Sequence, residues 1–203
     1  MKKLLQSFGI TGLCFDSRKA KIGDVFFAIK GESFDGNKFI KELLNRGIKL
    51  IITDDIKSVA INPERIVHVD NARIALGLAA SILFPKVPKL MVAATGTNGK
   101  TSVTSYCRQL YSLLGKQSCN IGTLGIEYST NIDLTTISKI LDEAPSLTTT
   151  DPISFRKILD NLAKNNIDYL AFEASSHGLH QDRLHGIKLQ AACFTSNEYN
   201  CLQ

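Results

Sequence analysis

The chain has 203 residues, of which 44% are hydrophobic and 21% are charged, and its formal net charge is +5. This length allows one large domain or two small ones, and the composition is that of a soluble globular protein whose core needs no disulfides. The positive charge is mild and forms no dense basic face with interleaved aromatic residues. We therefore expect anionic small ligands and no nucleic-acid partner.

The five cysteines are widely spaced and include no C-x-x-C pair, which favours reduced thiols over a disulfide framework. Residues 1–5 begin like a signal peptide, but Gln6 and Ser7 interrupt the apolar run. No stretch of the sequence approaches the roughly 20 apolar residues of a membrane span. We therefore expect a cytoplasmic protein without a membrane partner.

The first block, residues 1–84, is predicted to form a small α/β domain. Short apolar runs indicate its strands, at residues 24–30, 50–53 and 66–69. Helical spacing indicates two helices, at residues 40–47 and 72–84, and Asp70 or Asn71 can cap the second. Two prolines within residues 85–89 then interrupt the pattern and indicate a linker.

The second block, residues 90–203, is predicted to form a larger α/β domain. Apolar runs indicate strands at residues 90–94, 167–172 and 188–194, and residues 118–128 contain a turn at Gly122–Gly125. A helix after Thr101 carries an apolar stripe: Val103, Tyr106, Cys107, Leu110, Leu113 and Leu114. A second helix begins at Asp151-Pro152 and carries Phe155, Ile158, Leu159 and Leu162 on one side. This alternation predicts a mostly parallel sheet with helices on both faces.

The segment between the strand at 90–94 and the following helix is typical of a phosphate-binding loop. Gly96 and Gly99 allow the backbone to approach an anion, Lys100 adds a point charge, and Thr101 offers a hydroxyl to Mg²⁺. A full Walker A pattern would place glycine where this chain has Ala94. The alternative is a Gly-Lys-Thr helix start without a ligand, but the flanking strand and helix favour a nucleoside triphosphate site.

Glu173 follows the apolar run at 167–172, at the end of a predicted strand where ligands of open parallel sheets bind. A carboxylate beside a phosphate loop can hold Mg²⁺ together with Thr101; alternatively, Glu173 is a surface or capping residue. The following segment, 175–183, is unusually polar, and its Arg183 suits a pyrophosphate or is simply an exposed loop arginine. His177, His180 and His185 lack the spacing of a zinc site.

Together these pieces resemble the Mur ligases, and within that family the branch that adds the third residue of the peptidoglycan peptide. The resemblance covers roughly residues 14–195 and accommodates Ala94, since the family's loop resembles T-G-T-N-G-K-T. The segments that carry it are Asp16-Ser17-Arg18 with Gly23–Ala28, Gly31–Gly36, Thr95–Thr101, Thr148-Thr149, and Glu173–Leu179 with Gln181 and Arg183. These segments imply a small α/β UDP-binding domain followed by a P-loop ATPase domain, which is truncated here.

The resemblance implies a ligase that requires ATP and Mg²⁺. In the family, ATP phosphorylates a carboxylate of UDP-MurNAc-L-Ala-D-Glu, and the amine of meso-diaminopimelate or L-lysine attacks the acyl phosphate to give an amide, ADP and phosphate. Such chemistry needs alignment and charge neutralisation more than covalent help from the protein. Two different P-loop enzymes, a folylpolyglutamate-synthase relative and a small-molecule kinase, are disfavoured by the segment Ser175–Leu179.

The same resemblance assigns the site residues. ATP would be bound by Gly96, Thr97, Asn98, Gly99, Lys100, Thr101 and Ser102, with Lys100 and Glu173 catalytic and Thr101 and Glu173 as metal ligands. The uridine diphosphate would contact Ser17, Glu32, Ser33 and Phe34. The muramoyl-peptide would contact Thr148, Thr149, Ser175, Gln181 and Arg183, while Leu147 stands where some relatives have a polar contact residue.

The chain departs from the family pattern after Thr195. An Asn-Leu-x-x-Asp-His-Leu-Asp-like run is expected there, but this chain reads Ser196–Gln203. The carbamylated lysine of the family and the domain that selects the amino-acid substrate would lie beyond this point, so the sequence does not distinguish diaminopimelate from lysine. We therefore expect that the 203 residues do not catalyse ligation by themselves. We also expect the sheet of the second domain to have an uncovered edge. We interpret these residues as the amino-terminal part of such a ligase, from a truncated, split or frameshifted gene, with a second polypeptide as one way of completing it. The alternative is a non-catalytic remnant that binds nucleotide or the UDP-muramoyl compound.

Overall fold

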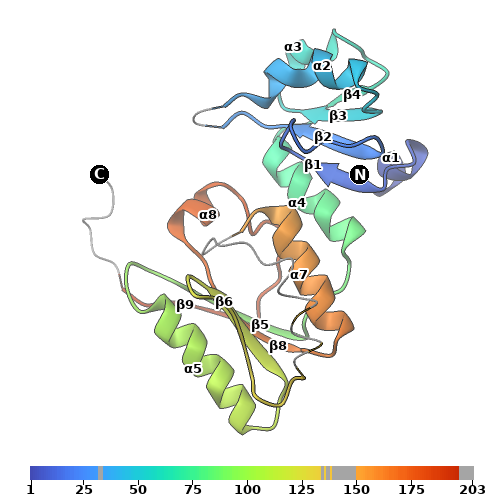
Figure 1. Ribbon diagram of the computed structural model, residues 1–203. Helices are drawn as coiled ribbons and strands as arrows, with labels where there is room; N and C mark the ends of the chain where they lie inside the picture. The colour runs from blue at the N-terminus through green and yellow to red at the C-terminus, as the bar shows by residue number, and fades with distance from the viewer. Residues whose placement is uncertain (32–33, 134, 136–137, 139–149, 197–203) are drawn as a thin grey trace. The chain divides into compact units, whose positions relative to one another are not determined.

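The computed structural model describes residues 1–31, 34–133, 135, 138 and 150–196, and the chain divides into two compact units, Met1–Leu83 and Phe84–Gln203 (Figure 1). Each unit has its own parallel or mostly parallel sheet and its own hydrophobic core. The predicted α/β fold class is therefore confirmed. Among the described helices, none has the length and apolar character needed to cross a membrane.

The first unit contains a four-stranded parallel sheet in the order β1-β2-β3-β4. Its strands are β1 (Gly12–Cys14), β2 (Asp24–Ala28), β3 (Leu50–Thr53) and β4 (Ile66–His68). In the register, Phe26 lies opposite Cys14 on one side and Ile51 on the other. Strands β2 and β3 are buried on both faces, which is why they were recognisable as nearly continuous apolar runs.

The helical segments of this unit are α1 (Lys2–Ser7), η1 (Gly36–Phe39), α2 (Ile40–Asn45), α3 (Ile56–Val59) and α4 (Ala72–Leu83). Of the two candidate caps for α4, Asn71 is the one used, because its side-chain oxygen accepts hydrogen bonds from the N–H groups of Arg73 and Ile74 at 2.9 and 3.0 Å. The sequence patterns did not predict α1, β1 or α3, which are too short to show a clear period.

The second unit contains a five-stranded sheet in the order β7-β6-β8-β5-β9. Its strands are β5 (Leu90–Thr95), β6 (Ser118–Gly122), β7 (Gly125–Tyr128), β8 (Tyr169–Glu173) and β9 (Ala191–Phe194). Among the strand pairs that the structure describes in this unit, only the β6–β7 hairpin is antiparallel, and its turn lies at the predicted Gly122–Gly125. The sheet is therefore mostly parallel, as predicted.

Two helices, α5 (Lys100–Leu113) and α7 (Pro152–Lys164), cover opposite faces of this sheet (Figure 1). The two faces are distinguished by alternating residues of β8, since successive side chains of a strand point to opposite sides. Tyr169 packs on Tyr111 of α5, whereas Phe172 packs on Phe155 of α7, each with ring centroids 5.0 Å apart. Glu173 has the same parity as Tyr169, so it belongs to the α5 face.

Helix α7 begins as predicted. Helix α5, by contrast, does not pack on the sheet through the apolar stripe predicted from its sequence. The Asp151 carboxylate caps α7, and the predicted stripe of Phe155, Ile158, Leu159 and Leu162 is buried. In α5 the only buried residue is Thr104, and Arg108 faces the sheet, where it donates to Asn120 Oδ1 at 2.7 Å.

The apolar stripe predicted for α5 instead lies largely in contact with solvent. Its most exposed members are Tyr106, Leu110, Leu113 and Leu114. Strand β9 is also exposed at all four residues and forms one edge of the sheet within the described part of the chain. The expected uncovered surface of the second unit is therefore formed by one side of α5 and by β9.

Candidate functional site

The loop after β5 changes direction at its two glycines. Gly96 has φ 133° and Gly99, the residue that precedes α5, has φ 84°, in the region that favours glycine over other residues. A Cβ atom at Gly96 would also overlap the Thr195 side chain. Both glycines singled out in the sequence are thus required by the backbone, and the loop leads directly into the N-terminus of α5.

Lys100 lies at the first position of α5 and reaches back across this loop. Its Nζ donates hydrogen bonds to the carbonyl oxygens of Gly96 at 2.7 Å and Thr97 at 3.0 Å. The ammonium group is therefore held close to the amide groups of the loop and to the helix N-terminus. The positive charge of Lys100 and the partial positive charge at the N-terminus of α5 both favour an anion at this place.

The segment that follows β9 borders the same loop. The N–H groups of Thr97 and Asn98 donate to the carbonyl oxygen and hydroxyl oxygen of Ser196, at 3.1 and 3.0 Å. The Thr195 hydroxyl donates to the carbonyl oxygen of Thr95 at 3.1 Å. Sequence reasoning gave Thr195 and Ser196 no role, although β5 and β9 run parallel as neighbours and therefore end at the same edge of the sheet.

Glu173, at the end of β8, is 1% exposed and its carboxylate meets the loop through Thr101. The Thr101 hydroxyl donates to Glu173 Oε1 at 2.7 Å. Two further donors come from Thr123 in the β6–β7 turn, its N–H to Oε1 at 3.1 Å and its hydroxyl to Oε2 at 3.0 Å. The structure thus brings together the two residues that the sequence nominated as metal ligands, and it adds Thr123.

The donor set at this place fits Mg²⁺. A carboxylate and a hydroxyl are hard oxygen ligands, and Mg²⁺ is commonly held by one or two protein carboxylates together with water and substrate phosphates. Within the described ranges there is no group of three or more His, Cys, Asp or Glu side chains arranged to hold a metal ion. One carboxylate and one hydroxyl suit a cation that brings phosphate and water as its remaining ligands.

The polar segment after β8 forms a short helix, α8 (Ser176–His180), whose N-terminus is capped by Ser175. The Arg183 guanidinium donates to Gln181 Oε1 at 3.1 Å from Nε and 2.8 Å from Nη2, so these two predicted substrate contacts lie together. Thr148 and Thr149, which were predicted to join them, lie outside the described residues. The role of this segment toward a substrate stays a prediction.

A cavity of about 350 Å³ lies in the first unit, beside the turn that follows β1. Ser17 and Phe34, two of the predicted uridine diphosphate contacts, both line it, whereas Glu32 and Ser33 lie outside the described residues. Its other walls include Phe15, Phe26, Phe39 and the Asp16–Arg18 pair. Aromatic walls with a few polar groups and this volume are typical of small-molecule sites.

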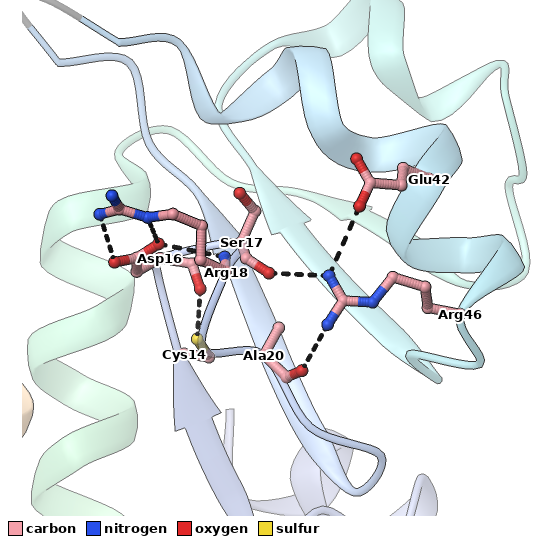
Figure 2. A network of polar contacts seen from close by, with 7 residues as sticks. All are labelled: Cys14, Asp16, Ser17, Arg18, Ala20, Glu42 and Arg46. Atoms are coloured by element: carbon pink, nitrogen blue, oxygen red, sulfur yellow. Dashed lines mark hydrogen bonds and ion pairs between the residues drawn. The ribbon is translucent and has the colours of Figure 1, made fainter.

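The turn beside this cavity is held by a polar network (Figure 2). Arg18 Nε and Nη2 donate to the two carboxylate oxygens of Asp16 at 2.9 and 2.8 Å, and this hydrogen bonding lowers the pKa of Asp16. Arg46 donates to the carbonyl oxygens of Ser17 and Ala20 at 2.9 and 3.0 Å. The Cys14 thiol donates to the Asp16 carbonyl oxygen, and burial raises the pKa of that thiol. The network fixes the backbone that carries Ser17.

Comparisons with known proteins find matches to both units of the chain. The model of the Mur ligase middle domain matches residues 94–199, and that of the Mur ligase family, catalytic domain, matches residues 9–92. The UDP-N-acetylmuramoyl-L-alanyl-D-glutamate–2,6-diaminopimelate ligase of Rickettsia felis is 50% identical over 97% of this chain and 36% of its own length. The corresponding ligase of Mesorhizobium japonicum is 40% identical over 92% of this chain and 37% of its own length.

A solved structure of a UDP-N-acetylmuramoyl-L-alanyl-D-glutamate–2,6-diaminopimelate ligase is 26% identical and superimposes with a TM-score of 0.75, covering 96% of this chain and 38% of that one. The chain therefore spans well under half the length of the relatives it matches. Their likeness nevertheless extends over both units, and the middle-domain model alone matches more than half of the residues. The glycine-rich loop before α5, the carboxylate beside it and these matches lead to one conclusion: the chain belongs to the Mur ligase family.

Proposed function

We propose that these 203 residues carry the nucleotide site and the UDP-sugar site of a ligase that joins meso-diaminopimelate, or L-lysine, to UDP-MurNAc-L-Ala-D-Glu. The hydrogen bond between Thr101 and Glu173 is the observation that carries the proposal, because it joins the phosphate loop to a buried carboxylate on the neighbouring strand. The names of the relatives in Rickettsia and Mesorhizobium support the diaminopimelate reaction.

At the nucleotide site, the loop residues Gly96–Ser102 would bind the phosphates of ATP. Mg·ATP would supply the phosphoryl group that activates the substrate carboxylate. Lys100 would place its charge on the transferred phosphate, and the Thr101 hydroxyl oxygen and Glu173 would hold the metal. Because phosphoryl transfer depends on alignment and charge neutralisation, no covalent role for these residues is required.

The first unit would bind the uridine diphosphate end of the substrate in its cavity of about 350 Å³. The aromatic side chains that line this cavity can cover the uracil ring, and Ser17 offers a hydroxyl on a turn that Arg46 holds in place. Ser175, Gln181 and Arg183 would contact the muramoyl-peptide, with Arg183 as the charged group for an anionic part of the substrate.

The 203 residues alone are proposed to bind ligands without forming the amide. The support is the share of the relatives' length that the chain covers, 36–39% among the Rickettsia ligases. A second polypeptide that supplies the amino-acid site, and a purely binding role, are two proposals for how these residues act. Incubating it with ATP, UDP-MurNAc-L-Ala-D-Glu and either amino acid distinguishes turnover from binding, and formation of ADP and tripeptide would contradict this part of the proposal.

Isothermal titration calorimetry with Mg·ATP tests the nucleotide site directly. Glu173→Gln keeps the size of the side chain but removes its charge, so Mg·ATP affinity should fall about 10-fold or more while ATP binding in EDTA changes little. Glu64→Gln, an exposed carboxylate in the first unit, is the matched control. No Mg·ATP uptake by the folded wild-type chain would refute the proposal.

A further inference from the structure

The β6–β7 turn lies against the carboxylate of Glu173. Ile121 of β6 lies opposite Phe172 of β8 in the parallel register, so Gly122, one residue later, comes beside Glu173. A Cβ atom on Gly122 would overlap the Glu173 carboxylate. The glycine therefore leaves the space that this buried side chain occupies.

Thr123, the next residue, holds both oxygens of the same carboxylate. Its N–H donates to Oε1 at 3.1 Å and its hydroxyl donates to Oε2 at 3.0 Å, while Thr101 donates to Oε1 at 2.7 Å. Hydrogen bonds to an ionised acceptor are roughly twice as strong as neutral ones, and donors on both oxygens fix the plane of a carboxylate that could otherwise rotate. The turn thus determines the orientation of Glu173.

The surroundings of Thr123 argue against a role in packing. Thr123 is exposed although Glu173 is buried, and its neighbour in the turn, Leu124, is 71% exposed. A hydroxyl at this place adds little to the hydrophobic core, yet it contacts the one carboxylate that meets the phosphate loop. Groups that hydrogen-bond to a metal ligand and orient it matter for metal affinity, since removing one typically costs about 10-fold to 100-fold.

We propose that Thr123, with the space left by Gly122, is a positioning residue for the metal-binding carboxylate of this ligase. The inference rests on the proposed Mg·ATP site. Thr123 fixes Oε2, so that Oε1 stays toward the Thr101 hydroxyl and the side chain presents a constant geometry to Mg²⁺. Its contribution should therefore be seen in the Mg²⁺ dependence of nucleotide binding and not in nucleotide binding without metal.

The test uses the full 203-residue chain and the non-hydrolysable analogue AMP-PNP. Calorimetric titrations over a series of Mg²⁺ concentrations, and in EDTA, are compared for wild type, Thr123→Val and Thr123→Ser. We expect Thr123→Val to require about 10-fold more Mg²⁺ for half-maximal tightening, with unchanged affinity in EDTA. Thr123→Ser retains the hydroxyl and should behave as wild type. Leu124→Ala is the matched control in the same turn.

Gly122→Ala gives an independent check, because the added methyl group must displace the carboxylate. It should shift the Mg²⁺ requirement in the same direction as Thr123→Val. Wild-type Mg²⁺ dependence in both variants, or a loss of affinity that is equal in EDTA and in Mg²⁺, would overturn the positioning role while leaving the nucleotide site intact. Absence of AMP-PNP binding by the wild-type chain would overturn the nucleotide site itself, and the positioning role with it.

Discussion

Ala94 and Glu173 occupy the same register position on the neighbouring strands β5 and β8, and the N–H of Ala174 donates to the Ala94 carbonyl oxygen at 2.9 Å. Ala94 is buried and still belongs to the strand, so the candidate phosphate-binding loop begins only after it. The glycine that a full Walker A pattern would place here is therefore unnecessary. Because Ala94 pairs with Glu173, the Glu173 carboxylate lies at the end of the sheet where this loop begins.

Lys100→Ala should weaken Mg·ATP binding by about 10-fold to 100-fold, since hydrogen bonds to a charged group contribute roughly 1.5–3 kcal/mol. The variant also loses the two hydrogen bonds that Lys100 makes across the loop. Calorimetry with Mg·ATP measures the effect. Lys188→Ala, which removes an exposed lysine of the same unit, is the control, and equal affinities for the two variants would remove Lys100 from the site.

Phe34→Ala should weaken binding of UDP to the first unit by about 3-fold to 10-fold, because an aromatic contact of this kind contributes roughly 0.5–1.5 kcal/mol beyond burial. Phe34 lines the cavity and is 79% exposed, so its loss should cost little stability. Ile22, 77% exposed and not part of the cavity lining, supplies the control Ile22→Ala. Unchanged UDP affinity in Phe34→Ala, measured by calorimetry, would exclude this side chain from the UDP site.

Leu159→Ala and Leu113→Ala should differ sharply in the free energy of unfolding. Leu159 of α7 is 0% exposed within the core of the second unit, so its truncation should cost about 2–5 kcal/mol. Leu113 of α5 is 84% exposed, so the same change there should stay within about 0.5 kcal/mol. Urea unfolding followed by circular dichroism measures both. A comparable loss in Leu113→Ala would mean that the exposed side of α5 is covered in solution.

Arg18→Ala should raise the pKa of Asp16 toward its ordinary value, because hydrogen bonding to Arg18 is the main cause of its lowered pKa. A carboxyl group whose pKa is lower in the folded state stabilises the fold above its unfolded pKa, about 3.9. That contribution disappears as the pH falls through the lowered folded value, so wild type and variant should converge in stability there. Carboxyl-carbon NMR titration measures the change. Asp55, whose pKa is lowered chiefly by Ser58, should titrate as before.

The elements that could be predicted from sequence are those in which the spacing of apolar residues matches the pattern of burial. β2, β3 and β5 are apolar runs, and α7 has a capping aspartate, a proline and a buried stripe. The stripe of α5 had the right period but did not reveal which side faces the sheet. Thr104 and Arg108 take that side, since Arg108 satisfies Asn120 there, and a sequence pattern does not show such a pairing.

At the candidate site, the contact between Thr101 and Glu173 could be anticipated because each residue has a local signal: Thr101 follows a Gly-Lys pair after a strand, and Glu173 is a carboxylate at a strand end. Thr123 could not, because its contact with Glu173 depends on the register between β6 and β8, which a hydrophobic pattern leaves open. Ser196 was missed for a related reason: it meets the loop only because β9 lies beside β5. The pairing of strands that are distant in sequence, more than residue type, determines the contacts of Thr123 and Ser196.

Strand β5 is flanked on one side by β8 and on the other by β9, while β7 and β9 form the margins of the sheet as far as the described residues build it. Fraying at either margin leaves the ladder between β5 and β8 intact, so the anchor points of Thr101 and Glu173 survive partial opening of the unit. Amide protons of this central pair should consequently exchange with deuterium more slowly than those of β7 and β9. The candidate site is therefore anchored on the strands of the sheet that we expect to open last.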